Sequence, residues 1–88
     1  MVEKRIRIVN QLGLHARAAG KLVRLASKYS SVVTLTNDGS TANARSILDL
    51  LTLAAGYGKF VDIRAEGTDE ETAIAEIEEL FRSGFGEI

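Results

Sequence analysis

The chain has 88 residues, no cysteine, one histidine and a formal net charge of -1. These numbers exclude disulfides and a thiolate or histidine-rich metal site within one chain, and they predict one domain spanning residues 1–88. The segment Val2-Glu3-Lys4-Arg5-Ile6-Arg7 is too charged for a signal peptide, and no apolar run reaches membrane-spanning length. We therefore expect a cytoplasmic protein, not inserted in a membrane, without a metal or another cofactor.

The first half of the chain predicts a strand, a helix and a hairpin. Residues 2–9 alternate in the manner of a strand, with Lys4, Ile6 and Ile8 on one side. Apolar residues spaced at i, i+3, i+4 and i+7 then predict a helix over about residues 15–29. A β-branched run at 32–36 leads into the hairpin signal Asn37-Asp38-Gly39 and a return strand at 41–44.

The second half predicts a helix, a strand and a last helix. Ser46 is a preferred N-cap residue for a helix that should extend toward Ala55 before glycines end it. Residues 60–66 predict a strand. Thr68 to Glu71 matches a capping box, and we expect Gly84 to stop the helix that follows. The expected buried stripe of this last helix is Ala73, Ile74, Ile77, Leu80 and Phe81.

The order β-α-β-β-α-β-α predicts an α+β fold with two layers, an open-faced sandwich. Four strands cannot have both faces buried by three helices, so the helices should cover one face of the sheet only. Of the strand pairings, only the hairpin follows from local sequence.

The histidine lies in the segment Gly13-Leu14-His15-Ala16-Arg17-Ala18-Ala19, at the expected start of the first helix. The first turn of a helix has free N–H groups and the positive end of the macrodipole. The N–H groups of Ala16 and Arg17 and the Arg17 guanidinium could contact phosphoryl oxygens while a ring nitrogen of His15 carries the covalent bond. On spacing alone, the alternative is an ordinary polar histidine beside a solvated arginine.

Basic residues line one face of the first helix in continuity with His15. They recur at i, i+4, i+7 and i+11, and they are Arg17, Lys21, Arg24 and Lys28. A charged stripe is often only a solvated face, and nucleic acid is one alternative ligand. The acidic overall balance and the lack of interleaved aromatic residues argue against nucleic acid. A basic face beside a reactive histidine favours an acidic protein partner.

The helix at 46–55 has more apolar residues than one buried stripe requires. One face would consist of Ile47, Leu50, Leu51 and Ala54, and the apolar surface extends onto the next face through Leu48, Leu51 and Ala55. Such a helix is either buried on most sides or has exposed apolar surface suited to docking a partner. Sequence alone leaves both interpretations open.

The segment from Gly13 to Ala19, with Ser46-Ile47-Leu48 downstream and a glutamate-rich last helix, resembles the histidine-containing phosphocarrier (HPr) family of the bacterial phosphotransferase system over essentially the whole chain. The ending Leu80-Phe81-Arg82-Ser83-Gly84-Phe85 is most similar to its nitrogen-regulatory branch. The chain departs from the family at Ala18, where proline is usual, at Leu12, where a polar or small residue is usual, and at Leu48-Asp49-Leu50-Leu51, where many members carry a run like Met-Gly-Val-Met.

The resemblance implies an antiparallel sheet in the strand order 1-4-2-3. It also implies a carrier rather than a stand-alone enzyme: His15 would take a phosphoryl group from enzyme I on Nδ1, leaving Nε2 free to protonate, and pass it to an enzyme IIA protein. We expect a monomer. The expected partner-binding residues are Ala16, Gly20, Lys21, Arg24, Ile47, Leu48 and Leu51.

Ser46 has two interpretations. As an N-cap it stabilises its helix by about 1 kcal/mol. In part of the family the matching serine is phosphorylated by a dedicated kinase, which impairs transfer at the histidine. The runner-up function is therefore a regulatory binding module in which phosphorylation of His15 or Ser46 controls a target protein.

Overall fold

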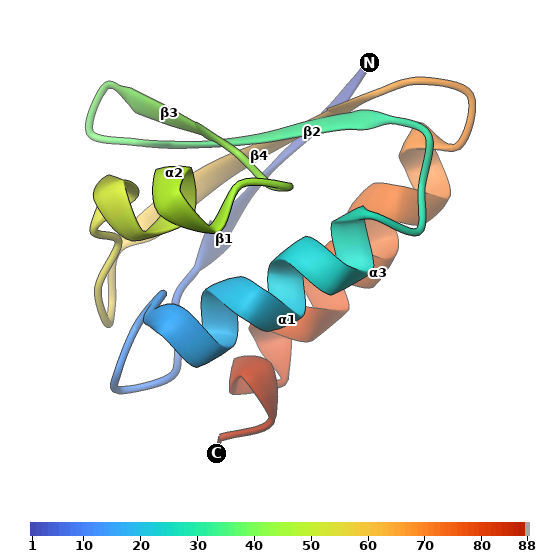
Figure 1. Ribbon diagram of the computed structural model, residues 1–88. Coiled ribbons are helices and arrows are strands. Elements are labelled where there is room, and N and C mark those ends of the chain that lie inside the picture. The colour runs from blue at the N-terminus through green and yellow to red at the C-terminus, as the bar shows by residue number, and fades with distance from the viewer. Residues whose placement is uncertain (88) are drawn as a thin grey trace.

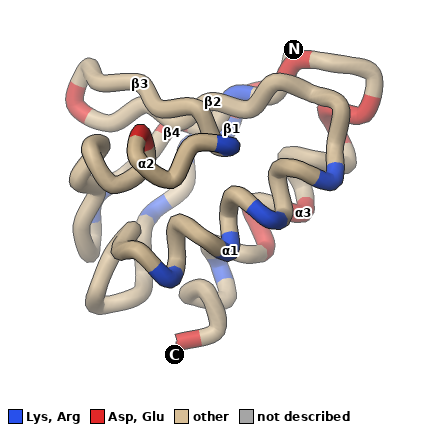
Figure 2. Tube along the Cα trace, in the orientation of Figure 1, with Lys and Arg blue, Asp and Glu red and all other residues tan. Residues whose placement is uncertain are grey.

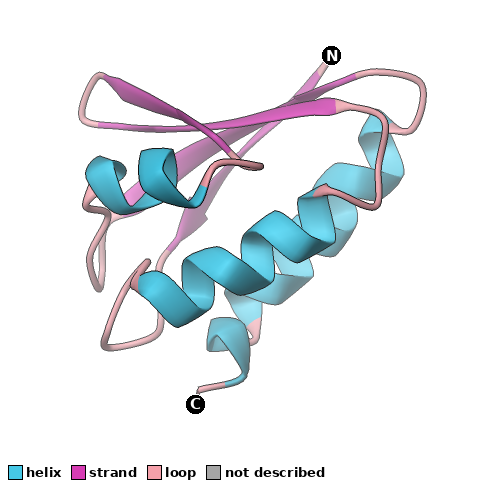
Figure 3. Cartoon of the chain, viewed as in Figure 1, coloured by secondary structure: helices cyan, strands magenta, loops and turns pink. Residues whose placement is uncertain are grey.

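The computed structural model describes residues 1–87. Its elements are β1 (Val2–Arg7), α1 (Ala16–Ala26), β2 (Val32–Asn37), β3 (Ser40–Asn43), α2 (Ile47–Leu53), β4 (Phe60–Glu66), α3 (Glu70–Arg82) and a short 3-10 helix, η1 (Gly84–Gly86). The four strands form one antiparallel sheet in the order β1-β4-β2-β3. The helices all lie on one face of this sheet (Figures 1 and 3). The predicted fold class and strand order are confirmed.

The core fills the space between the sheet and the helices. Alternate strand residues point toward the helices, and the apolar stripes of α1 and α3 pack onto them. The ring of Phe81, in α3, meets the ring of Phe85 edge to face, with 4.8 Å between the centroids. This contact anchors η1, and with it the C-terminal segment, to the core. In the part of the chain that is described, no helix is both long and apolar enough to cross a membrane.

The face of the sheet away from the helices carries paired charges. Arg5 lies opposite Asp62 in the β1–β4 register, and their side chains form an ion pair at 2.9 Å. The neighbouring pair joins Glu3 and Arg64 at 3.1 Å. Exposed pairs of this kind contribute little to stability, but they keep this face polar and compatible with water.

Two helices end earlier than the sequence predicted. α1 ends at Ala26 rather than Tyr29, with Ser27 as its C-cap residue, whose hydroxyl and N–H both donate to the carbonyl of Val23, at 2.7 and 2.9 Å. α2 ends at Leu53, because Ala54 adopts the left-handed conformation (φ +55°) that the sequence assigned to the glycines beyond it.

The predicted capping box at Thr68–Glu71 is wrong. α3 begins at Glu70 with Asp69 as its N-cap, yet the Asp69 side chain makes no cap bond. Its carboxylate accepts from the N–H groups of Ser30 (2.9 Å) and Ser31 (3.0 Å) and from the Ser31 hydroxyl. These bonds, the hydroxyl first, favour the charged form and lower the pKa of Asp69. The carboxylate is therefore used to hold the α1–β2 loop instead of its own helix.

Candidate functional site

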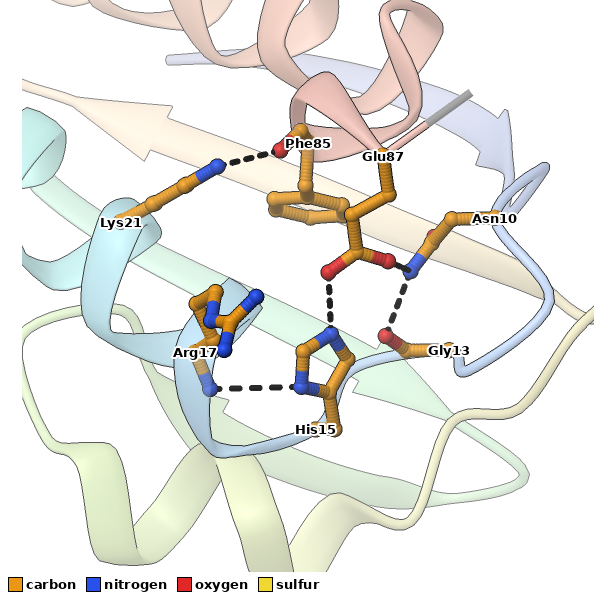
Figure 4. Close-up of polar contacts among 7 residues, drawn as sticks. All are labelled: Asn10, Gly13, His15, Arg17, Lys21, Phe85 and Glu87. Carbon is orange, nitrogen blue, oxygen red and sulfur yellow. Dashed lines mark hydrogen bonds and ion pairs between the residues drawn. The ribbon is translucent and has the colours of Figure 1, made fainter.

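His15 is the N-cap residue of α1, and its own ring forms the cap. The backbone is extended there (φ -81°, ψ -179°), and the carbonyl accepts from the N–H of Ala19 at 2.8 Å. Ring atom Nδ1 accepts from the N–H of Arg17 at 3.3 Å (Figure 4). A backbone N–H can only donate, so Nδ1 carries no proton and a neutral ring has its proton on Nε2.

The second ring nitrogen faces the C-terminal segment. Nε2 of His15 contacts one carboxylate oxygen of Glu87, and the other oxygen accepts from the side-chain amide of Asn10 at 3.0 Å (Figure 4). The same amide donates to the carbonyl of Gly13 at 2.8 Å. These contacts lower the pKa of Glu87, with the Asn10 hydrogen bond as the largest cause and the contact with His15 adding to it. Sequence reasoning missed both Asn10 and Glu87.

Arg17 and Lys21 reach the same region from α1 but differ in their engagement. Nζ of Lys21 donates to the carbonyl of Phe85 at 2.6 Å and so ties η1 to α1. The guanidinium of Arg17 has no hydrogen-bond partner among residues 1–87 and is exposed beside the ring (Figure 4). Its donors are therefore available to an anion. An open pocket of about 820 Å³ lies here, lined by Arg17, Lys21 and Glu87 together with Leu12 and Tyr57.

The loop before His15 is fixed against the loop that follows α2. The N–H of Leu14 donates to the carbonyl of Ala55 at 3.0 Å. Gly13 has φ +64°, and a Cβ at this position would lie 2.8 Å from the same carbonyl oxygen. Only glycine allows this close approach, which sets the position of His15 relative to α2.

Ser46 is the N-cap of α2, as predicted. Its hydroxyl oxygen accepts from the N–H of Asp49 at 3.2 Å. The reciprocal half of a capping box is absent, because the Asp49 carboxylate accepts from the N–H of Asn43 at 3.2 Å and the Ser46 N–H donates to the Asn43 carbonyl. Ser46 caps a different helix from the one that His15 caps, and no hydrogen bond joins the two within the described residues.

The apolar residues of α2 divide between the core and the surface. Leu50 is fully buried, whereas Leu48 is 75% exposed, Ile47 44% and Leu51 40%. α1 packs against α2, so this apolar patch adjoins the helix that carries Ala16, Gly20 and Arg24. Figure 2 shows the Lys and Arg residues along α1. The structure therefore brings an apolar patch and a basic helix face together near the histidine.

The site as a whole is suited to holding a phosphoryl group on Nδ1. That atom carries no proton, and its lone pair accepts only the long 3.3 Å hydrogen bond from the Arg17 N–H, which phosphorylation would release. It lies against the N-terminal turn of a helix and has the Arg17 guanidinium nearby. The free N–H groups of that turn can receive anionic oxygens.

Comparisons with known proteins agree with this geometry. A family model described as "PTS HPr component phosphorylation site" matches residues 2–83. The phosphocarrier protein HPr of Xylella fastidiosa is 44% identical over 87 residues, covering 99% of this chain and 98% of that protein. The phosphocarrier protein NPr of Proteus mirabilis is 46% identical over 85 residues, covering 96% and 94%.

Solved structures give the same result. The crystal structure of HPr-C-His from Thermoanaerobacter tengcongensis superposes with a TM-score of 0.96 at 43% identity, covering 100% of this chain and 99% of that one. An HPr dimer from the same organism gives a TM-score of 0.79 at 44% identity, with coverage of 99% and 100%. A match across nearly the whole length, in sequence and in structure, shows the family. The chain belongs to the HPr family, the phosphocarrier proteins of the phosphotransferase system.

Proposed function

We propose that His15 accepts a phosphoryl group from enzyme I, which is charged by phosphoenolpyruvate, and passes it to a histidine of an enzyme IIA protein. The observation that carries this proposal is the orientation of the ring. Nδ1 presents its lone pair to the first turn of α1, where Arg17 supplies an N–H group and an exposed guanidinium. Dependence on phosphoenolpyruvate, a metabolite of the cytoplasm, is our reason to assign the protein to that compartment.

The role of the protein in each transfer is to position the ring and to stabilise charge. The Nδ1 lone pair attacks phosphorus while the bond between phosphorus and the donor's atom breaks. The first-turn amides of Ala16 and Arg17 and the Arg17 guanidinium would contact the phosphoryl oxygens. The exposed position of this turn suits a carrier, because two different proteins must reach it in succession.

The partners would dock on the surface around the ring. Leu48, Ile47 and Leu51 offer an exposed apolar centre. On α1, Lys21 and Arg24 offer a basic border, with the small residues Ala16 and Gly20 beside them. Such a surface fits a partner with an apolar patch and an acidic rim, since charge complementarity speeds encounter and fixes orientation. We propose that the carrier works as a monomer, because docking of this kind requires the whole face to be free.

The test is incubation with phosphoenolpyruvate and enzyme I, followed by phosphorus NMR. The product should be an acid-labile, base-stable phosphohistidine. His15→Ala should accept no label, and the matched control Ser46→Ala should accept it normally. Label that survives acid treatment, or that persists in His15→Ala, would overturn the proposal.

The second candidate is a regulatory module switched at Ser46. Ser46 lies at the start of α2, the helix that carries the apolar patch. The residue is half-buried. A phosphate there would place negative charge at the edge of the proposed docking surface and weaken docking of an acidic partner. Ser46→Asp should then slow transfer from enzyme I while the stability of the fold is kept, and Ser46→Ala should not. Equal transfer rates in the two variants would exclude this candidate.

A further inference from the structure

We propose that Asn10 and Glu87 act as a pair of positioning residues that keep a proton on Nε2 of His15 while Nδ1 carries the phosphoryl group. This inference rests on the proposed phosphocarrier function. It assigns a role to two residues from opposite ends of the chain, separated by 77 positions.

The first support is the geometry of the contact. Nε2 of His15 points at one oxygen of Glu87, and both side chains are largely covered, with 25% and 18% of their surfaces exposed. The N–H of Arg17 already donates to Nδ1. The proton of the neutral ring is therefore on Nε2 and is donated to a carboxylate, which makes a charge-assisted hydrogen bond.

The second support is the state of Asn10. Its side chain is fully buried, and its Nδ2 group donates to Glu87 and to the Gly13 carbonyl. Its Oδ1 atom is buried without a hydrogen-bond partner within residues 1–87. Both groups facing Nδ2 are acceptors, so the amide cannot be reversed, and an unpaired buried oxygen has a free-energy cost. The unpaired oxygen is compatible with a role for Asn10 in which the Nδ2 group is held in place by the Gly13 carbonyl and orients the Glu87 carboxylate.

The third support is how the C-terminal segment is held. The chain reverses at Gly84, Phe85 and Gly86, which all have positive φ. Phe85 is buried against Phe81, and its carbonyl accepts from Lys21. These contacts place Glu87 beside the ring independently of its own interaction with His15.

The chemistry explains what a fixed Nε2 proton would contribute. When Nδ1 attacks phosphorus, the ring becomes positive, with the phosphoryl group on Nδ1 and the proton on Nε2, and the Glu87 carboxylate faces that charge. In the next transfer the P–Nδ1 bond breaks, its electron pair returns to Nδ1, and the ring leaves neutral with the same proton still on Nε2. No proton has to move in either step. A ring without that proton would have to leave as an anion, which is slower.

The test compares Glu87→Ala with Glu76→Ala, which removes the same charge from an exposed position in the middle of α3. In the unphosphorylated protein, proton NMR should show the Nε2 proton of the only histidine in the wild type and in Glu76→Ala. It should be lost to exchange with water in Glu87→Ala. The side-chain amide signals of Asn10 should also shift in Glu87→Ala and stay in place in Glu76→Ala.

The second arm measures the hydrolysis rate of the phosphorylated protein between about pH 6 and 9. The hydrolysis rate should fall as the pH rises, because the phosphorylated ring loses its Nε2 proton. In Glu87→Ala the midpoint of this fall should lie about one pH unit lower, because the negative charge that retains the proton is gone. Among residues 1–87, the other charged or titratable groups that line the pocket beside the ring are Arg17 and Lys21 of α1 and Tyr57 of the loop after α2. Asn10→Ala should give a smaller shift in the same direction.

The proposal is overturned if the Nε2 proton is equally visible in Glu87→Ala and the wild type, or if the two pH profiles coincide. A failure of enzyme I to phosphorylate His15 would instead reject the proposed function. In that event the NMR comparison on the unphosphorylated protein still decides whether Glu87 holds the Nε2 proton.

Discussion

The carboxylate of Asp69, at the N-terminus of α3, binds both the N–H and the hydroxyl of Ser31, at the end of the α1–β2 loop. The two residues are 38 positions apart. Gly67, two residues before Asp69, packs so closely on Ser31 that a Cβ there would lie 2.6 Å from the Cα of Ser31. The start of α3 and the loop after α1 are thus fastened together by one side chain.

Asp69→Asn should lower the free energy of unfolding. An amide is uncharged and has only one oxygen, so it cannot replace the carboxylate that accepts from the Ser30 N–H, the Ser31 N–H and the Ser31 hydroxyl. The lowered pKa of Asp69 in the folded state means that its contribution is present above the unfolded value and is lost as the pH falls. The difference between wild type and variant should therefore be large at pH 7 and shrink as the pH falls from about 5 toward 2. Urea unfolding at several pH values measures it. Asp38→Asn, at an exposed turn, is the control, and a difference independent of pH would contradict the prediction.

Gly13→Ala and Gly20→Ala should change stability in opposite directions. A methyl group at Gly13 meets the carbonyl of Ala55 at 2.8 Å with φ +64°, so we expect a loss of about 1–3 kcal/mol. At Gly20, within α1, the nearest atom to a Cβ is an Arg24 side-chain nitrogen at 3.6 Å. Alanine should therefore gain about 0.5–1 kcal/mol through helix propensity. Thermal or urea unfolding checks both, and a stabilised Gly13→Ala would show that the two loops are not in close contact.

Leu48→Ala and Leu50→Ala should separate docking from folding. Leu50 is fully buried, and its truncation should cost about 2–5 kcal/mol of unfolding free energy. Leu48 is exposed, so its truncation should stay within about 0.5 kcal/mol of the wild type. Titration calorimetry with enzyme I should nevertheless show weaker binding for Leu48→Ala. Unchanged affinity would remove Leu48 from the docking surface.

Arg17→Ala should slow phosphoryl transfer and leave the unfolding free energy nearly unchanged, since the guanidinium makes no hydrogen bond within residues 1–87. Arg17→Lys should restore transfer only in part, because an ammonium group lacks the planar fork that binds two phosphoryl oxygens together. Quenched-flow measurement of transfer from phosphorylated enzyme I provides the rates. If Arg17→Ala transfers at the wild-type rate, the side chain is only solvated.

The elements of the fold could be predicted because each has a local cause. The alternation of residues 2–9, the turn at Asn37 to Gly39 and the Ser46 cap all depend on neighbours in sequence. The strand order came from the resemblance, since pairing between β1 and β4 is not encoded locally. The capping-box prediction at Thr68 to Glu71 was wrong for a related reason. The Asp69 carboxylate accepts hydrogen bonds from Ser30 and Ser31, which are distant in sequence, and not from its own helix.

The candidate site was predictable only where its residues are neighbours. His15 and Arg17 share one helical turn, so their association follows from spacing. Glu87 reaches the ring through a reversal in which Phe85, a residue with a Cβ, takes φ +57°. That conformation is unfavourable by itself and is held by burial of the aromatic ring. No pattern near Glu87 indicates the outcome, which depends on packing in the assembled core.

The two ends of the described chain lie at opposite poles of the molecule (Figure 1). The N-terminal amine pairs with Glu70 at 2.8 Å, at the start of α3, whereas Glu87 lies against His15. An affinity tag or fluorescent fusion joined directly after Glu87 would therefore crowd the histidine and the surface where partners are proposed to dock. Reagents for binding and kinetic work on this protein should carry their labels at the N-terminus, where a flexible spacer leaves the histidine accessible.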